Sequence, residues 1–137
     1  MNVKAYLDQI HVIDCRIKNM VRQLEVLKSL AERTTAALSD LPGAKDVHRR
    51  EGIMAEFIDQ KDETQKEIAE LMKTRREIVS VIKSVPDLTQ RTLLEERYIY
   101  ARSWHVISKL INYSIAQTYR FHDEALEAVG HILEDSE

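Results

Sequence analysis

The chain has 137 residues and a formal net charge of −3, and it is rich in hydrophobic (44%) and charged (31%) residues but holds only three glycines and two prolines. This composition is typical of a helix-rich protein, either one compact domain or a small domain with an extended element. No apolar run approaches the roughly 20 residues that cross a bilayer, the first residues lack the pattern of a secretion signal, and the single Cys15 excludes an internal disulfide.

Two long helices are predicted in residues 1–85. Hydrophobic residues recur at alternating steps of three and four along residues 3–38, with one polar interruption at Thr34. A second series with the same spacing follows along residues 47–85, and its middle is more polar, with Lys61, Thr64 and Arg75 among the repeated positions. A repeat of 3.5 residues places these positions on one seam of each helix, as in a coiled coil. Pro42 and Gly43 end the first helix and allow the chain to reverse. We therefore expect a long antiparallel helical hairpin.

A second apolar row flanks the seam one position further on, at Leu7, Val21, Ile58, Met72 and Val79. This makes the apolar stripe wider than contact between two helices needs. It predicts a homodimer in which two hairpins form a four-helix bundle. The alternative is that the C-terminal part of the chain folds back onto the same stripe.

Three shorter helices are predicted after Pro86, which ends the hairpin. The first runs from about residue 87 or 89 to residue 100, and its inner side is expected to hold Leu88, Leu93, Leu94, Tyr98 and Ile99. The second begins after Ser103 and the third after Ser114, because serine is a preferred N-cap. Asn112 occupies the turn between them and tolerates a left-handed backbone. These are the dimensions of a helix-turn-helix.

One set of residues in this segment resembles a known family. The set consists of Leu88, Leu94, Arg97, Tyr98, Ser103 to Ile107, Asn112 to Ser114, Gln117, Thr118, Ala125 and Leu126. Over residues 88–133 it resembles region 4 of sigma factors. It is more similar still to small phage and prophage transcription regulators that join such a domain to an N-terminal helical segment.

The resemblance implies an all-α fold in which a helical hairpin (residues 1–85) for oligomerisation precedes a three-helix DNA-binding domain with an acidic tail (residues 86–137). It implies a sequence-specific regulator of phage type, acting in late-gene control in the cytoplasm of a bacterial host. Double-stranded DNA is the expected partner, and RNA polymerase a further candidate.

The resemblance also implies which residues contact DNA, because in that family the third helix is the recognition helix that enters the major groove. The residues expected at base edges are Arg120, Gln117, Tyr119, Ile115 and Ala116. The residues expected at phosphates are Arg102, Lys109, Ser103, Ser114 and Arg97. Charge argues against DNA binding, because a nucleic-acid binder normally carries a clear basic stripe, whereas residues 85–120 carry a net charge of only +2 and residues 121–137 a net charge of −6.

An enzyme is not expected. The five histidines are dispersed, no glycine-rich phosphate loop is present, and no catalytic residue, metal ligand or cofactor site is predicted. Two other functions remain open. One is a protein–protein adaptor that binds polymerase, a sigma factor or another phage protein without reading DNA. The other is a packaging protein similar to a terminase small subunit, which would form rings larger than dimers.

Overall fold

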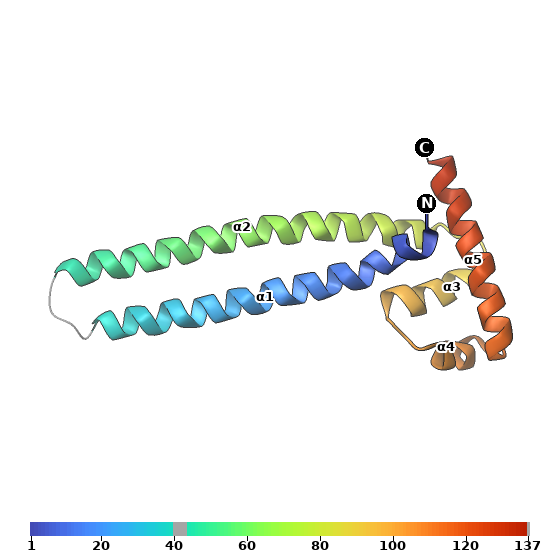
Figure 1. The fold of residues 1–137 in the computed structure, drawn as a ribbon, viewed down its shortest axis with the longest axis horizontal. Coiled ribbons are helices and arrows are strands. Elements are labelled where there is room, and N and C mark those ends of the chain that lie inside the picture. The colour runs from blue at the N-terminus through green and yellow to red at the C-terminus, as the bar shows by residue number, and fades with distance from the viewer. Residues whose placement is uncertain (40–43, 137) are drawn as a thin grey trace. The chain divides into compact units, whose positions relative to one another are not determined.

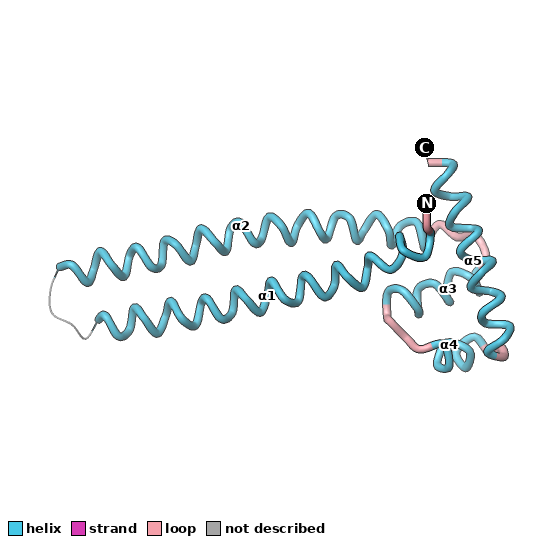
Figure 2. Tube along the Cα trace, in the orientation of Figure 1, coloured by secondary structure: helices cyan, strands magenta, loops and turns pink. Residues whose placement is uncertain are grey.

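The computed structural model describes residues 1–39 and 44–136, and over these residues every regular element is helical. The elements are α1 (Val3–Ser39), α2 (Ala44–Lys83), α3 (Leu88–Leu94), the π-helix η1 (Glu95–Ile99), α4 (Trp104–Ile111) and α5 (Ile115–Asp135). Short loops join the later helices (Figure 2). The reversal predicted at Pro42–Gly43 lies outside the described residues. None of the described helices has the length and apolar composition needed to cross a membrane.

The chain forms two compact units. The helix-pair unit is residues 15–71, and the composite unit is residues 1–14 together with 72–137. The composite unit thus unites the first turns of α1 and the last turns of α2 with everything that follows. The division at residue 85 separates an oligomerisation part from a DNA-binding part by function, and it stays a prediction.

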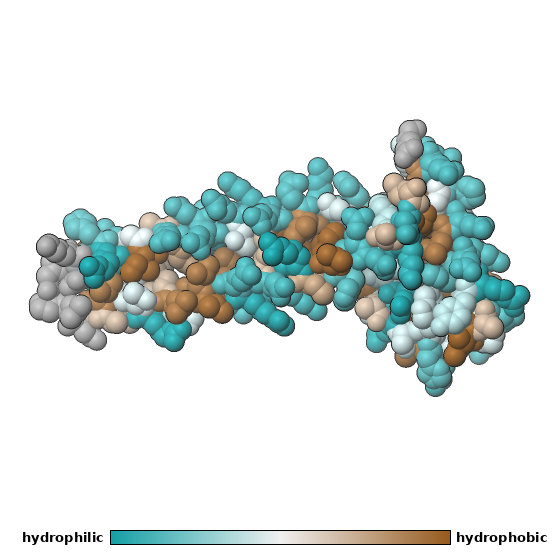
Figure 3. All heavy atoms as spheres, in the orientation of Figure 1, coloured by the Kyte–Doolittle hydropathy of each residue, from teal (hydrophilic) through white to brown (hydrophobic). Residues whose placement is uncertain are grey.

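The helix-pair unit consists of the rest of α1 and α2, which run antiparallel beside each other (Figure 1). Met20, Ala31 and Leu38 are the seam residues that become buried here. Leu27 of α1 and Phe57 of α2 are half-buried and line one common hollow. Apolar side chains remain visible along the pair in the space-filling view (Figure 3). The contact between α1 and α2 therefore buries only part of the apolar seam of this unit.

The composite unit has a tighter core. Leu7 and Ile10 of α1, and Ile78 and Ile82 of α2, are at most 1% exposed. Leu7 is one of the flanking residues expected to meet a second chain, and this expectation is wrong for Leu7, because it is completely buried within the composite unit. Burying these branched aliphatic side chains stabilises the fold by about 1.5–3 kcal/mol each.

A polar seam residue is neutralised in the same unit. Arg75 of α2 donates from Nε to Asp14 Oδ1 of α1 over 2.7 Å and from Nη2 to Asp14 Oδ2 over 3.4 Å. Both side chains are about one third exposed, at 30% and 33%. A charged residue thus fits at a seam position because the facing helix supplies its counter-charge.

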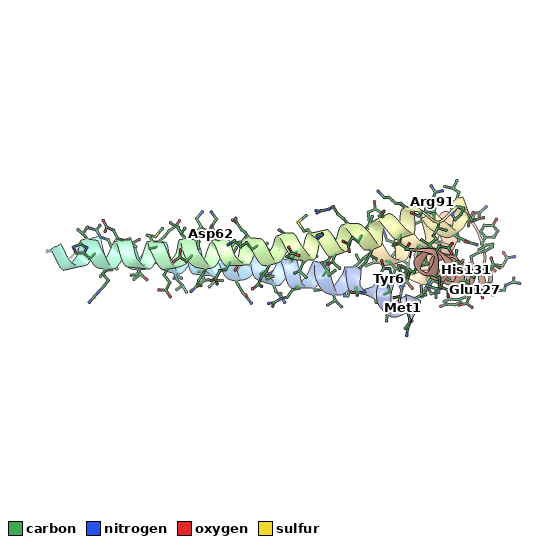
Figure 4. All side chains as sticks on the ribbon, turned by 90° about the horizontal axis from the view of Figure 1, so that it is seen from above. Met1, Tyr6, Asp62, Arg91, Glu127 and His131 are labelled. Carbon is green, nitrogen blue, oxygen red and sulfur yellow. The ribbon has the colours of Figure 1, made fainter. Side chains whose placement is uncertain are left out.

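The start of α3 is fixed by capping. Asp87 accepts a hydrogen bond from the Gln90 backbone N over 2.8 Å, and the Arg91 guanidinium donates to the Val85 carbonyl over 3.0 Å (Figure 4). Leu88 is 69% exposed, which corrects the expectation that it points inward. As the first residue after the cap it lies on the outer side of the turn, whereas Leu93, Leu94 and Tyr98 are buried as expected.

Candidate nucleic-acid interface

The segment from α4 to α5 begins with a capped helix. The Ser103 hydroxyl accepts a hydrogen bond from the Val106 backbone N over 3.3 Å, with Ser103 in an extended conformation. This satisfies one of the amide groups that a helix start leaves without a partner. The N-cap predicted at Ser103 is confirmed.

The turn after α4 depends on one left-handed residue. Asn112 has φ 64° and ψ 44°, and Tyr113 N donates to the Ser108 carbonyl over 3.0 Å. Ser114 then caps α5, accepting from Gln117 N over 3.2 Å. Asparagine suits this position because its cost in the left-handed region is lower than that of most residues. The predicted turn residue and the second predicted cap are both confirmed.

The contact between α4 and α5 holds the start of α5 in place. Ile107 of α4 and Thr118 of α5 are completely buried, and Ser108 is 5% exposed. The two hydroxyls are satisfied within their own helices, since Ser108 Oγ donates to the His105 carbonyl and Thr118 Oγ1 donates to the Ser114 carbonyl, each over 2.8 Å. The packed side of this segment is therefore fully hydrogen-bonded, and the opposite side faces solvent.

Four of the five residues expected at base edges lie on that exposed side. Ile115 is 43% and Tyr119 is 47% exposed, and Ala116 and Arg120 are exposed as well. Gln117 is half-buried. The first two turns of α5 thus present a mixed apolar and polar surface in which Arg120 is the only cation.

Arg120 lies beside an acidic residue of its own helix. Gln117, Arg120, Phe121 and Glu124 line one shallow hollow on α5. Among the described residues, no ion pair involves Arg120. Its guanidinium is therefore available to a ligand, although Glu124 one turn further on partly offsets its charge.

The residues expected at phosphates are not equivalent in the structure. Lys109 is exposed in the last turn of α4. Arg102 has 57% of its side chain exposed and lies 3.7 Å from Glu96. Arg97 is occupied internally, because its guanidinium lies 4.6 Å over the Trp104 ring and donates to the Arg102 carbonyl over 2.9 Å. Arg97 thus supports the loop that carries Arg102.

An aromatic cluster underlies the interface. Trp104 meets Tyr119 with ring centroids 5.3 Å apart and meets His122 at 4.5 Å. Tyr98 Oη and His122 Nε2 are hydrogen-bonded at 2.7 Å, and these two side chains are 6% and 7% exposed. Stacked and edge-on aromatic pairs add to the stability that burial provides.

Burial sets the protonation of this pair. Desolvation lowers the pKa of His122 below its usual value, and the nearby Asp123 carboxylate opposes this only in part. Desolvation, together with Asp8, raises the pKa of Tyr98 to about 12. Tyr98 therefore keeps its proton and the His122 ring is neutral, and the tautomer of the ring decides which of the two side chains donates.

The Tyr98–His122 pair and the helix that positions Tyr98 were missed by sequence reasoning. One continuous helix was expected up to Tyr100, whereas residues 95–99 form a π-helix, with Tyr100 N bonded to the Glu95 carbonyl over 3.1 Å. The backbone then turns sharply at Ala101, which has φ 55°. No local signal in the sequence marks this change, since Ala101 is not a residue type that favours positive φ.

The second half of α5 is acidic. Its exposed acids are Asp123, Glu124, Glu127, Glu134 and Asp135. A polyanion is repelled by such a surface. Within the described segment from α4 to α5, the first two turns of α5, together with α4 and the Arg102 loop, lie outside this acidic surface.

Comparison with known proteins supplies a family. Residues 40–130, which contain α2, α3, η1, α4 and most of α5, match the family described as Protein of unknown function (DUF1492). No curated protein and no solved structure matches the chain. Because the matched segment covers well over half of the 137 residues, the chain belongs to this family.

Proposed function

We propose that the chain is a transcription regulator of phage type, which binds double-stranded DNA through α4, the turn at Asn112 and the first two turns of α5. The observation that carries the proposal is the pair of serine-capped helices joined by three residues, with Ile115, Tyr119 and Arg120 exposed on the second helix. Those dimensions match a helix-turn-helix, whose second helix enters the major groove. The resemblance to sigma region 4 supports the same reading.

Each exposed side chain has a definite role in this proposal. Arg120 pairs with the O6 and N7 atoms of guanine, and a good pair of this kind contributes about 1–3 kcal/mol of discrimination. Ile115 and Ala116 contact thymine methyl groups. Tyr119, held against Trp104, presents a rigid ring to the groove wall, and Gln117 assists at adenine.

Few positive charges hold the phosphates. Arg102 and Lys109 are the exposed cations near the helix starts, and the N-terminal amides capped by Ser103 and Ser114 add partial positive charge. Two phosphate contacts, from Arg102 and Lys109, predict a slope of about −2 for the logarithm of affinity against the logarithm of salt concentration. One domain should therefore bind weakly.

In this proposal, two chains pair through the helix-pair unit, and this pairing raises their affinity for DNA. A second domain held close to the first binds at a high effective concentration, so that two weak sites act as one stronger site. The flanking residues Val21 and Ile58 of this unit are 41% and 49% exposed, so this row is not covered within one chain. We assign the protein to the cytoplasm of a bacterial host, with RNA polymerase as a further contact.

The test is a fluorescence-anisotropy titration with duplexes selected from a random pool. Lys109→Ala should weaken binding to all duplexes and reduce the salt slope by about 1. Arg120→Ala should weaken binding to the selected duplex and reduce its advantage over other duplexes. Lys61→Ala is the matched control, since Lys61 is exposed on α2 of the helix-pair unit and should have no effect. Equal effects of Lys61→Ala and Lys109→Ala would contradict the proposed interface.

A second candidate function is supported by the apolar character of the same segment. Five large apolar side chains of α4, the turn and α5 are 40–59% exposed, namely Val106, Leu110, Tyr113, Ile115 and Tyr119. Such a surface also suits an adaptor that docks on polymerase, a sigma factor or another phage protein. The adaptor predicts capture of purified polymerase or sigma factor in the absence of duplex, lost in Leu110→Glu and unchanged in Arg120→Ala.

A further inference from the structure

The helix-pair unit leaves apolar surface uncovered on one definite side. Val26 and Leu30, spaced four residues apart on α1, are 58% and 47% exposed. Leu30 lines a hollow of about 210 Å³ together with Leu27, Ile53 and Phe57. Two helices alone can bury only one stripe of each other, so this side is open for a further element.

We call this side the hollow face and define it by six residues. These are Val26, Leu30 and Arg33 on α1 and Ile53, Glu56 and Gln60 on α2. Spacings of three and four place each trio on one side of its helix. Leu30, Ile53, Glu56 and Gln60 line one hollow, while Val26 lines another on α1. The hollow face thus has an apolar centre with Arg33 on one helix and Glu56 on the other.

The two helices of this unit carry opposite charge. In residues 15–39 the charged residues are Arg16, Lys18, Arg22, Lys28 and Arg33 against Glu25 and Glu32, so five minus two gives +3. In residues 44–71 they are Lys45, Arg49, Arg50, Lys61 and Lys66 against Asp46, Glu51, Glu56, Asp59, Asp62, Glu63, Glu67 and Glu70, so five minus eight gives −3. A surface with this division complements a second copy of itself.

Charge also selects the orientation of that second copy. Thr34 lines the same hollow as Glu56, so the adjacent Arg33 lies at nearly the same level of the unit as Glu56. With the two helix pairs parallel, α1 faces α2 of the second copy, and Arg33 meets the opposite charge of Glu56 twice. With the two helix pairs antiparallel, α1 faces α1 of the second copy and α2 faces α2 of the second copy, so like charges meet.

We infer that a second copy of this chain docks on the hollow face, with the two helix pairs parallel and α1 of each copy against α2 of the other. The apolar side chain of Leu30 enters the hollow between Ile53 and Phe57 of the second copy. This inference rests on the pairing of chains proposed above and names the surface that carries it. It involves no residue of the proposed DNA interface.

The first test measures mass by light scattering over a concentration series of the full chain without DNA. The expected mass is twice 15.9 kDa. Arg33→Glu and Glu56→Arg should each raise the dissociation constant of the dimer about tenfold, because a two-fold axis repeats each change. The double variant should restore the dimer. Leu30→Arg should raise the constant at least a hundredfold, since it puts a charge into the apolar centre.

The competing face is tested with Val21→Arg, which lies on the opposite flank of the seam in the row expected from the sequence to meet a second chain. Pairing on the hollow face predicts that Val21→Arg leaves the dimer intact, and circular dichroism verifies that each variant remains helical. A dimer that survives Leu30→Arg but is lost in Val21→Arg overturns the choice of face. A wild-type chain that is monomeric at every concentration overturns pairing itself. A mass well above that of two chains also overturns pairing, and it supports the alternative of a packaging protein that forms rings larger than dimers. DNA binding is measured in the separate duplex titrations, whereas mass is measured without DNA. A failure of pairing can therefore be distinguished from a failure of DNA binding.

The second test measures orientation with the single cysteine. Cys15 is exposed on α1 and accepts one spin label per chain without any mutation. Parallel pairs put the two labels at the same level, roughly 20 Å apart across a bundle with 8–10 Å between neighbouring helices. Antiparallel pairs centred on the hollow separate them by roughly 40 Å along the bundle, at 1.5 Å per residue. A pulsed electron resonance distance near the longer value overturns the parallel arrangement.

Discussion

The buried Tyr98–His122 pair makes the stability of the composite unit depend on pH in a way that one substitution should remove. Both side chains are less than 10% exposed and their hydrogen bond is 2.7 Å long. His122→Gln keeps a polar side chain of similar size but no longer titrates. The wild type should therefore lose stability in mild acid, and the variant should lose less.

The sign follows from the lowered pKa of His122. In the unfolded chain this histidine takes up a proton near its usual pKa of about 6.5, whereas the folded chain takes it up only at lower pH. Above about pH 6.5 the ring is neutral in both states, and its contribution is fully present. As pH falls below that value, the unfolded state binds more protons, and the free energy of unfolding decreases by up to about 1.4 kcal/mol per pH unit.

Urea unfolding followed by circular dichroism at steps between about pH 5 and 8 measures this dependence. His131→Gln is the control, since His131 lies on the same helix with 77% of its side chain exposed. Its pH profile should match the wild type. Tyr98→Phe should lower the free energy of unfolding by about 1–3 kcal/mol at neutral pH, because it leaves the buried His122 Nε2 without a partner. Parallel profiles for wild type and His122→Gln would refute the reasoning.

Three further predictions concern stability and are measured by urea or thermal unfolding. A double-mutant cycle of Asp14→Ala and Arg75→Ala should give a coupling of about 0.5–1 kcal/mol, because both side chains are about a third exposed to solvent; a coupling of zero would show that the pair does not stabilise the fold. Ala101→Gly should raise the free energy of unfolding by up to about 1 kcal/mol, since φ 55° strains alanine but not glycine. Asn112→Val should lower it by about 1–2 kcal/mol because φ is 64° there, whereas an unchanged midpoint would mean that the turn adapts at no cost.

The sequence alone was sufficient for the local features of the helical segments. Ser103, Asn112 and Ser114 were expected at the ends of helices, and each has the expected backbone conformation. Cap and turn preferences arise from hydrogen bonds and steric contacts within three or four residues. They can therefore be predicted without knowledge of the rest of the fold.

Periodicity was a weaker guide to what each apolar residue touches. It identified the stripe that contains both Leu7 and Val21, yet Leu7 is completely buried while Val21 is 41% exposed. A heptad pattern shows which side of a helix is apolar, and it does not show which segment covers that side. The same limit explains why Leu88, in an apolar series, lies at the surface.

The sequence by itself determined that the chain is helical, where its short helices begin and which residues lie on the outer side of α5. Only the tertiary structure decided that Asp14 neutralises Arg75, 61 residues away, and that Tyr98 is hydrogen-bonded to His122, 24 residues away. Local backbone preferences act over one helical turn, whereas burial and the pKa of a buried group depend on all the segments packed around it. The tertiary structure also decided which of the cations expected at phosphates are accessible, since Arg97 is held by Trp104 while Lys109 remains exposed.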